Sequence, residues 1–332
     1  MKKLIFFFYI VLLFVLFIQP LNLFAQAAGY KITGNIIIDG PAKWDYLSIY
    51  KPLNQLFVSH GSEINVINLE NNSVIGKIDD LKGTHGIAFS SKYEKGFITD
   101  GKDNSVVIFN LKDLKIIQKV KTTGDGPDAI AYDPFTERVF SFNGDGENTT
   151  AIDAKTGEIA GTVKLTGGPE SGVSDFKGRM FVNIEKENVI NVFDSKTLSF
   201  IDKWNIAPCE QPTAMAIDRA NNRLFVGGRN QLFAVIDANS GKVIATFPIG
   251  KGVDACSYDP ETHLIFCSNK DATITVIEQD SADKYELVGS ITTLPGAKTM
   301  ALDDVTHKIY SSTMIPVEND KKSFGVLIIE RK

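Results

Sequence analysis

A repeat of about 40 residues constrains this chain more than any other feature. A small residue recurs inside a short apolar run that follows a glycine or proline cluster, at Ser48, Ala88, Ala131, Ser174, Ala216, Ser257 and Ala301. The intervals between these positions are 40, 43, 43, 42, 41 and 44 residues. Two of the units are near-copies, GPDAIAYDPFTERVF at 126–140 and GVDACSYDPETHLIF at 252–266. The chain therefore consists of repeated units that must pack against one another to bury a core.

Each unit predicts four short strands. In the fifth, an apolar strand at 214–217 is followed by a polar turn at 218–222 and an aromatic-containing strand at 224–226. A third apolar strand ends in the turn 237–241, and a fourth occupies 243–247. β-Branched and aromatic residues fill the strands, and Gly, Pro, Asn and Asp separate them. Four strands every ~40 to 45 residues predict an all-β, seven-bladed β-propeller of four-stranded antiparallel blades.

The two ends of the repeated region predict how the ring closes. The last unit ends after its third strand, at 325–329, whereas 31–37 has the pattern of a fourth strand without a blade of its own. We expect this N-terminal strand to complete the last blade, which removes an open sheet edge. One domain then spans 28–332, with units that begin near residues 40, 82, 123, 166, 207, 250 and 292.

Residues 1–27 have the pattern of a cleavable signal peptide. Lys2 and Lys3 precede an apolar stretch at 4–17, and Ala25-Gln26-Ala27 offers small residues for cleavage after Ala25 or after Ala27. An uncleaved anchor is the alternative, because the apolar stretch reaches Phe24. No cysteine lies near the cleavage site, so a lipid anchor is not expected. We expect a periplasmic or secreted protein without membrane insertion after cleavage.

The charge of the chain argues against polyanionic partners. Its formal net charge is −5, and removal of two lysines with the signal would make it −7, since 1–27 contains no acid. No run of Lys and Arg offsets this, so neither a nucleic acid nor an anionic membrane surface is expected as a partner. We expect a monomer that binds a protein or a small polar ligand.

The three cysteines leave two alternatives. An odd number allows at most one internal disulfide, and Cys256 and Cys267 fall opposite each other in the near-copy hairpin. A cross-strand disulfide and a pair of buried free thiols are both compatible with this placement.

Several units resemble a known repeat. The segment 180–183 (MFVN), followed by 189–194 and 195–197, is similar to the YVTN repeat of seven-bladed propellers, as are 236–237 and 241–244. The chain therefore resembles the YncE-like group of exported bacterial proteins. The resemblance covers the whole expected mature chain and implies the propeller fold, and it implies no single activity because propellers serve many functions.

The repeat predicts which side chains reach the mouth of the central channel. The residues three positions before the recurring small residue are Asp45, His85, Asp128, Ser171, Thr213, Asp254 and Lys298. We expect them to form a ring, called here the mouth ring. Loops between second and third strands add His60, Asp100, Asn143, Glu185, Arg229 and Asn269 to the same face, and Trp44, Glu170 and Glu210 lie near ring positions in sequence. His60 and His85 come from neighbouring units and could converge, whereas His263 and His307 belong to turns on the opposite face.

Three functions fit the mouth ring. It can bind a ligand or a protein without chemistry, which we favour. It can hold Ca²⁺, Mg²⁺ or Zn²⁺ through Asp45, His85, Asp128 and Asp254. The metal or His85 can also support hydrolysis or elimination, as in lactonase- or lyase-type propellers. No nucleophile elbow, paired-carboxylate motif or HExxH motif names a catalytic residue.

Overall fold

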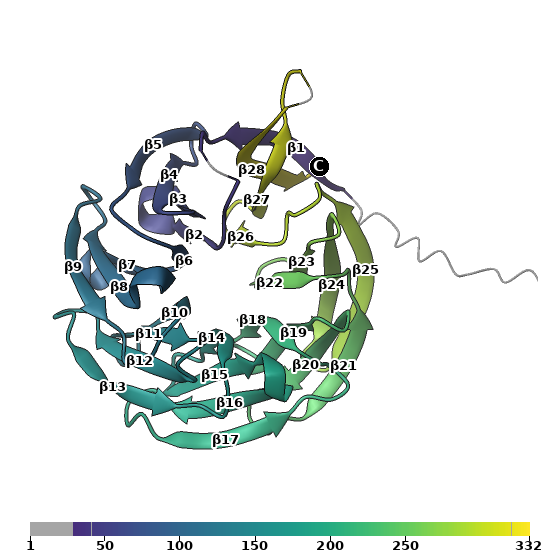
Figure 1. Cartoon of the computed structure of the whole chain (residues 1–332). Coiled ribbons are helices and arrows are strands. Elements are labelled where there is room, and N and C mark those ends of the chain that lie inside the picture. The colour runs from purple at the N-terminus through teal and green to yellow at the C-terminus, as the bar shows by residue number, and fades with distance from the viewer. Residues whose placement is uncertain (1–28, 41, 320) are drawn as a thin grey trace, which may run out of the picture.

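The computed structural model describes residues 29–332 except residues 41 and 320. The predicted signal segment and its cleavage positions lie outside the described residues. The described chain forms seven four-stranded antiparallel sheets arranged as blades around a central axis (Figure 1), which confirms the predicted fold. In each blade the first strand lies nearest the axis and the fourth lies at the rim.

The blades follow one another along the chain. Blade 1 contains β2 (Leu47–Tyr50), β3 (Gln55–His60), β4 (Glu63–Asn68) and β5 (Ser73–Ile78); blade 2 contains β6 (Thr84–Ser90), β7 (Lys95–Asp100), β8 (Ser105–Asn110) and β9 (Ile116–Lys121). Blade 3 contains β10 (Pro127–Asp133), β11 (Arg138–Asn143), β12 (Asn148–Asp153) and β13 (Ile159–Lys164); blade 4 contains β14 (Pro169–Ser174), β15 (Arg179–Ile184), β16 (Val189–Asp194) and β17 (Phe200–Asn205). Blade 5 contains β18 (Pro212–Asp218), β19 (Arg223–Gly228), β20 (Leu232–Asp237) and β21 (Val243–Pro248); blade 6 contains β22 (Val253–Asp259), β23 (Leu264–Asn269), β24 (Thr273–Ser281) and β25 (Lys284–Thr292). Blade 7 contains β26 (Met300–Asp303), β27 (Lys308–Pro316), β28 (Lys322–Arg331) and β1 (Tyr30–Ile37).

The N-terminal strand closes the ring as predicted. β1 pairs antiparallel with β28, from Tyr30 opposite Arg331 to Ile37 opposite Gly325. The hydrogen bond from Ile38 N to Phe324 O, 2.8 Å, extends this pairing by one step. The last blade is thus assembled from both ends of the described chain, so no blade presents an unpaired third strand.

The helical content of the described residues is limited to short 3-10 turns. These are η1 (Lys51–Leu53), η2 (Ser91–Tyr93), η3 (Gly101–Asp103) and η4 (Glu185–Glu187). In this part of the chain, no helix has the length and apolar character needed to cross a membrane.

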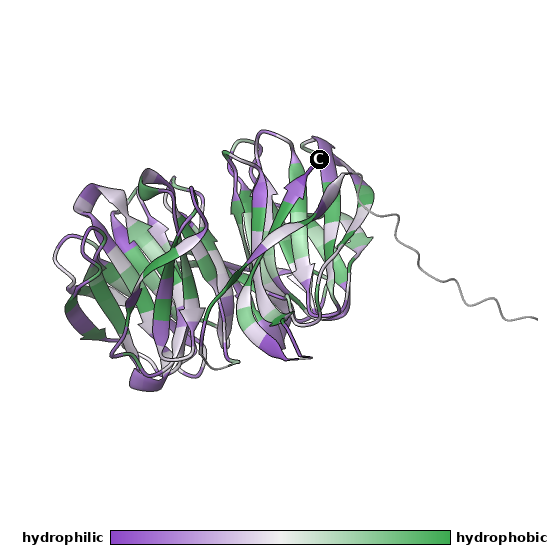
Figure 2. Cartoon of the chain, turned by 90° about the horizontal axis from the view of Figure 1, so that it is seen from above, coloured by the Kyte–Doolittle hydropathy of each residue, from purple (hydrophilic) through white to green (hydrophobic). Residues whose placement is uncertain are grey.

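An aromatic residue at one position of every second strand fills the space between blades. All seven are almost fully inaccessible to solvent, and they are Phe57, Phe97, Phe140, Phe181, Phe225, Phe266 and Tyr310. Burial of one such ring in each blade gives the repeat its core and makes each blade depend on its neighbours. Figure 2 shows the molecule edge-on, with hydrophobic residues gathered in the strands and hydrophilic residues in the turns.

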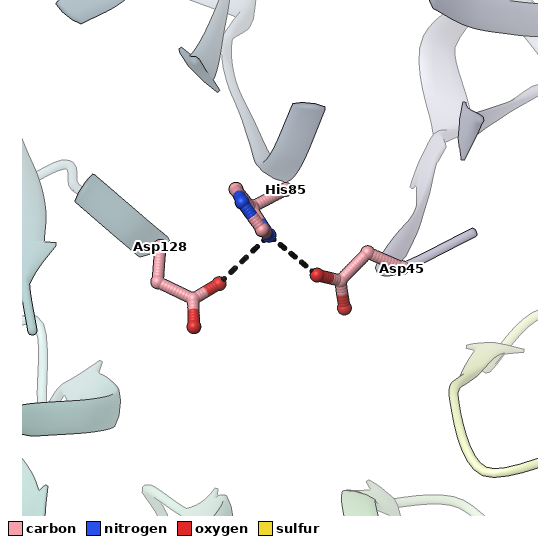
Figure 3. A group of neighbouring side chains, drawn as sticks. All are labelled: Asp45, His85 and Asp128. Atoms are coloured by element: carbon pink, nitrogen blue, oxygen red, sulfur yellow. Dashed lines mark hydrogen bonds and ion pairs between the residues drawn. The ribbon is translucent and has the colours of Figure 1, made fainter. Parts of the chain in front are cut away.

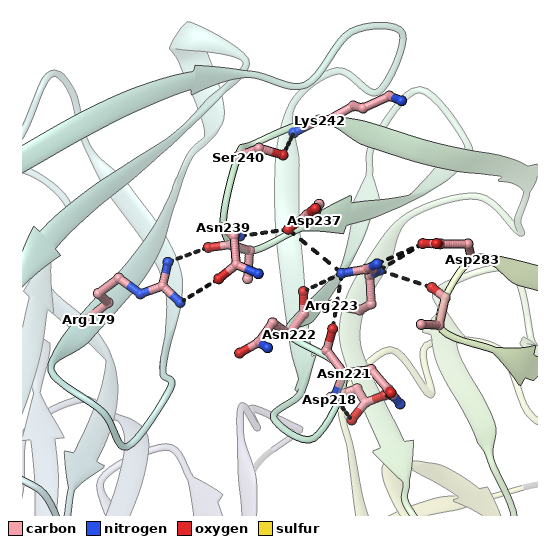
Figure 4. A network of polar contacts seen from close by, with 12 residues as sticks. Arg179, Asp218, Asn221, Asn222, Arg223, Asp237, Asn239, Ser240, Lys242 and Asp283 are labelled. Atoms are coloured by element: carbon pink, nitrogen blue, oxygen red, sulfur yellow. Dashed lines mark hydrogen bonds and ion pairs between the residues drawn. The ribbon is translucent and has the colours of Figure 1, made fainter.

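Arginines at the start of second strands bind the next blade on the face opposite the mouth ring. Each donates to a backbone carbonyl in the turn between the third and fourth strands of that blade, and the pairs are Arg138 with Ser195, Arg179 with Ala238 and Arg223 with Ala282. Arg223 also donates to Asp283 Oδ1 at 2.7 Å (Figure 4). These bonds fix the rotation of blades 3 to 6 relative to one another and thereby the alignment of their inner strands.

Candidate functional site

β-Bulges place five of the seven mouth-ring residues at the channel. The register between first and second strands shifts between Thr84 and Ile87 in blade 2 and between Pro127 and Ile130 in blade 3. Equivalent shifts occur in blades 4, 5 and 6. Each shift contains the ring residue of its blade, such as His85 or Asp128. Because a bulge re-aims the side chain that it contains, the ring positions differ from the ordinary alternation of these strands.

Three of the ring residues meet in one group. His85 Nδ1 lies 2.6 Å from Asp45 Oδ2 and 3.4 Å from Asp128 Oδ1 (Figure 3). One potential ligand atom from each residue lies within 4.8 Å of the others. We call Asp45, His85 and Asp128 the mouth triad. Its members come from blades 1, 2 and 3, and all three side chains are partly exposed.

Polar side chains of the preceding blade hold the backbone at two members of the mouth triad, His85 and Asp128. The Ser59 hydroxyl donates to the carbonyl oxygen of His85, and the Thr99 hydroxyl donates to that of Asp128. Thr99 Oγ1 also accepts a hydrogen bond from Gly86 N at 2.8 Å. Both hydroxyl residues are fully buried. These two residues were not predicted from the sequence. A hydroxyl side chain inside an otherwise apolar second strand could have indicated them, because a buried polar group needs a hydrogen-bond partner.

The carboxyl of Asp128 holds its proton unusually tightly. Burial raises the pKa of Asp128 to about 6, the negative charge of Asp45 adds to the rise, and His85 opposes it. Its Oδ1 is buried and accepts no hydrogen bond from any described residue. The pKa of His85 is also raised, because the Asp45 hydrogen bond and the Asp128 charge outweigh the lowering effect of its burial.

A cavity of about 370 Å³ opens beside the triad. It spans blades 2 to 4 and is lined by His85, Gly101, Lys102, Gly126, Pro127, Asp128, Gly144, Asp145, Gly168, Pro169, Glu170, Glu185 and Lys186. Burial raises the pKa of Glu170 to about 8, with further contributions from a hydrogen bond to Glu185 and from the Glu185 charge. Glu185 in turn pairs with Arg229. The cavity therefore brings together carboxyl groups whose environments resist ionisation.

Asp254 and Lys298 pair with each other across blades 6 and 7. Burial raises the pKa of Asp254, although the Lys298 charge opposes the rise. Of the four residues expected from the sequence to hold a metal, Asp45, His85 and Asp128 have donor atoms within 4.8 Å of one another, whereas the Asp254 carboxylate pairs with the Lys298 ammonium group. Asp254 lines the narrower channel below the mouth.

The two hydroxyl residues of the mouth ring, Ser171 and Thr213, hydrogen-bond to the backbone of the next blade. Ser171 Oγ donates to Thr213 O at 2.6 Å, and Thr213 Oγ1 donates to Val253 O at 2.9 Å. The expectation that they face a ligand is wrong for Thr213, which is buried, since its hydroxyl joins blades 5 and 6. Ser171 borders the narrower channel, which has a volume of about 170 Å³.

Three residues predicted from the second-to-third-strand loops also belong to the scaffold. Asp100 accepts hydrogen bonds from the backbone of Lys82 and Gly83 at 2.9 and 2.8 Å. Asn143 donates to Thr150 Oγ1 and Asn269 donates to Thr275 Oγ1. Each lies at the end of a second strand and is fully inaccessible to solvent. Their assignment to a ligand surface is wrong because the side chains turn inward to satisfy neighbouring polar groups.

His60 does not join His85 at the mouth, contrary to expectation. Its ring is fully buried and stacks on Phe324 with centroids 4.2 Å apart, and its Nδ1 lies 2.9 Å from Asn65 Oδ1. The interface between blades 1 and 7 thus holds this histidine. His263 and His307 lie in turns on the opposite face with left-handed backbone conformations, as predicted for turn residues.

Tyr46 was not predicted as a channel residue. It follows Asp45, lines the narrower channel and packs against the apolar cluster between blades 3 and 4. Burial raises its pKa well above the usual value, and the charges of Asp128 and Asp45 raise it further. Of the other residues near the ring, Trp44 stacks on Phe324 at 5.5 Å and Glu210 is exposed.

Comparisons with known proteins identify the architecture. No family model matches the chain, and no curated protein matches its sequence. A crystal structure of the RRP9 WD40 repeats is similar with a TM-score of 0.78 and 9% identity, over 92% of this chain and 98% of that one. A structure of U3-55K gives a TM-score of 0.75 at 9% identity, over 91% and 99% of the two chains. At this identity the likeness shows the fold alone, and the YncE-like resemblance stays a prediction for the family.

Proposed function

We propose that this chain is an exported, YncE-like propeller that binds a small polar ligand in the cavity at its channel mouth. One observation carries the proposal: carboxyl groups with raised pKa values, from Asp128 and Glu170, border the same cavity. Ionisable groups that are kept partly dehydrated in a concave site are typical of binding and catalytic sites. The likeness to WD40 propellers supports the propeller fold that places this cavity at the channel mouth.

The size of the cavity favours a small molecule over a protein surface. About 370 Å³ is within the range of pockets that enclose a small ligand. Its wall combines glycine backbone from three blades with charged side chains of both signs, including Lys102 and Lys186. Such a wall offers hydrogen-bond donors and acceptors from backbone and charged side chains, so we expect a ligand with polar groups.

A cavity-filling variant tests this function. The Cβ of a residue at position 144 would lie 3.7 Å from its nearest neighbour, Pro169 O, so Gly144→Leu adds bulk to the cavity without a backbone clash. Gly34→Leu, whose Cβ would also have 3.7 Å of room, is the matched control in blade 7. The probes are small hydroxy acids, amino acids, diamines and monosaccharides, with binding detected by NMR. We expect at least one class to bind the wild type and the control but not Gly144→Leu. No binding to the wild type, or undiminished binding to Gly144→Leu, would overturn the proposal.

Hydrolysis is a second candidate that one observation favours. With a pKa of about 6, Asp128 is poised to accept a proton near neutral pH beside the cavity. Lactone hydrolysis by the wild type that Asp128→Asn lacks would support this function. Equal background rates with and without the protein would contradict it.

Export is part of the proposal and has its own test. Lys2-Lys3, the apolar stretch and Ala25-Gln26-Ala27 support a cleavable signal. We expect the mass of the protein recovered from the periplasm or medium to correspond to cleavage after Ala25 or Ala27. Full-length protein confined to the cytoplasm would contradict export.

A further inference from the structure

We propose that the mouth triad, Asp45, His85 and Asp128, binds one divalent first-row transition-metal ion such as Zn²⁺. The inference deepens the proposed function and rests on the channel mouth being the functional face. It goes beyond that function because it names the ion, its ligands and the side on which a further ligand can bind.

The separations between donor atoms fit a shared ion. Ligands at the usual Zn–N and Zn–O distances in a tetrahedral site lie roughly 3.4 Å from one another. His85 Nδ1 and Asp128 Oδ1 are 3.4 Å apart, and His85 Nδ1 and Asp45 Oδ2 are 2.6 Å apart. The second pair must open for an ion to enter, and all three donor atoms already lie within 4.8 Å of one another.

The type of donor selects the kind of ion. One imidazole with two carboxylates suits zinc and neighbouring transition metals, whereas Ca²⁺ and Mg²⁺ favour sites made of oxygen donors alone. Three protein ligands are also the number found in zinc sites that keep a position open for water or substrate.

Asp128 provides an observation that does not depend on the clustering. Its Oδ1 is buried, accepts no hydrogen bond within the described chain and points toward His85 (Figure 3). A buried carboxylate oxygen without a hydrogen bond is unusual in a folded protein. Its ion-pair partner, His85 Nδ1, lies 3.4 Å away, which is close to the separation of two ligands of one zinc ion.

The groups around the triad hold its ligands in place. Buried hydroxyls of Ser59 and Thr99 bind the backbone carbonyls of His85 and Asp128. Gly101 leaves room for the imidazole ring, because a Cβ there would lie 2.9 Å from His85 Nε2. Such supporting contacts are a common feature of metal centres.

The open position of the ion faces the cavity. His85 and Asp128 are both part of the cavity wall, so a ligand in the cavity can reach an ion held between them. A small molecule with oxygen donors, such as a hydroxy acid, is therefore the class of ligand that this ion would attract.

Zinc titration of the full mature chain, freed of metal with a chelator, tests the proposal. We expect calorimetry to show one equivalent of Zn²⁺, bound at least tenfold more tightly than Ca²⁺. Co²⁺ in the same site should give the visible bands of a tetrahedral complex. His85→Ala and Asp128→Asn should each weaken Zn²⁺ binding at least tenfold, with circular dichroism as the check on folding. Asp128→Asn decides the test if His85→Ala fails to fold, since it preserves the shape of the side chain.

Two control variants separate the triad from other zinc-binding groups. His307 Nδ1 lies 2.7 Å from Asp259 Oδ2 on the opposite face, so His307→Ala removes a similar His–Asp pair. In protein kept reduced, Cys256→Ser removes a thiol from the channel wall. We expect both variants to bind Zn²⁺ as the wild type does. The proposal is overturned if the wild type binds no Zn²⁺, if Asp128→Asn binds it undiminished, if a control variant abolishes binding, or if Ca²⁺ binds as tightly.

The zinc titration and the small-ligand binding test can fail independently of each other. Gly144→Leu should keep the zinc site and lose the small ligand. Zinc binding without any bound probe would contradict the proposed function alone. Probe binding to a chain that takes up no zinc would contradict the metal site alone.

Discussion

The imidazole of His85 in blade 2 hydrogen-bonds through Nδ1 to the carboxylate of Asp45 in blade 1, at 2.6 Å. Residues 40 positions apart thus meet because the repeat returns the chain to the channel once in each blade. This hydrogen bond joins blades 1 and 2 at the channel mouth and places a carboxylate beside the imidazole.

Asp45→Asn should lower the pKa of His85. Burial alone lowers this pKa, and the Asp45 hydrogen bond with the Asp128 charge reverses the effect. In metal-free protein we expect this fall to be measurable as a lower midpoint of the His85 signal in an NMR titration. An unchanged midpoint would contradict the assignment. The pKa of His85 in the folded protein lies above its usual value of 6.5. The His85–Asp45 pair therefore stabilises the fold fully below pH 6.5, and this stabilisation is lost as the pH rises through the pKa of the folded state.

Glu170→Gln should stabilise the metal-free protein at alkaline pH. The folded pKa of about 8 exceeds the usual 4.5, so the wild type loses stability as pH rises between these values. A neutral Gln avoids this loss and can donate to Glu185. We expect urea denaturation to show a gain of about 1 kcal/mol at pH 8.5 and a smaller gain at pH 5.5. A gain that is the same at both pH values would show that Glu170 is ionised normally.

Arg223→Ala should destabilise the ring. The guanidinium donates to Ala282 O at 2.9 Å and Asp283 Oδ1 at 2.7 Å, and it also binds two carbonyls of its own turn. Loss of charge-assisted hydrogen bonds of a largely buried side chain should cost about 2 kcal/mol in the free energy of unfolding. Lys164→Ala, at an exposed position on β13, is the control and should change little. Equal effects of the two substitutions would contradict the role assigned to Arg223.

Cys256 and Cys267 should form a disulfide in exported protein. They are directly opposed in the antiparallel pair β22–β23, and their sulfur atoms lie 2.8 Å apart as free thiols. Opposed residues of antiparallel strands have Cα separations within the range of disulfides. Alkylation in denaturant should then detect one thiol in each chain, that of Cys209. Three alkylated cysteines in the exported protein would show that the pair stays reduced.

The sequence alone predicted the ring of seven blades and its closure by the N-terminal strand. The spacing of small residues, the aromatic residue of each second strand and the unpaired strand pattern at 31–37 are local signals, and each corresponds to a feature of the blades. The same spacing placed Asp45, His85 and Asp128 near one another.

The spacing of the repeat did not predict the hydrogen-bond partners of individual side chains. Asp100 and Glu185 occupy similar sequence positions, yet Asp100 turns inward to bind backbone amides while Glu185 reaches the cavity. The bulges at His85 and Asp128 depend on pairing with the second strand, which a repeat pattern does not encode. Tyr46 likewise lines the narrower channel and packs against the apolar cluster between blades 3 and 4, a long-range contact that the repeat does not encode.

In this account the channel mouth is the functional site. Anomalous diffraction from a Zn²⁺-soaked crystal of the mature protein, collected on both sides of the zinc absorption edge, is the sharpest test of it. The account predicts a peak between Asp45 Oδ2, His85 Nδ1 and Asp128 Oδ1, with the open side of the ion toward the cavity. Zinc peaks confined to other parts of the protein, with none at the mouth triad, would contradict it.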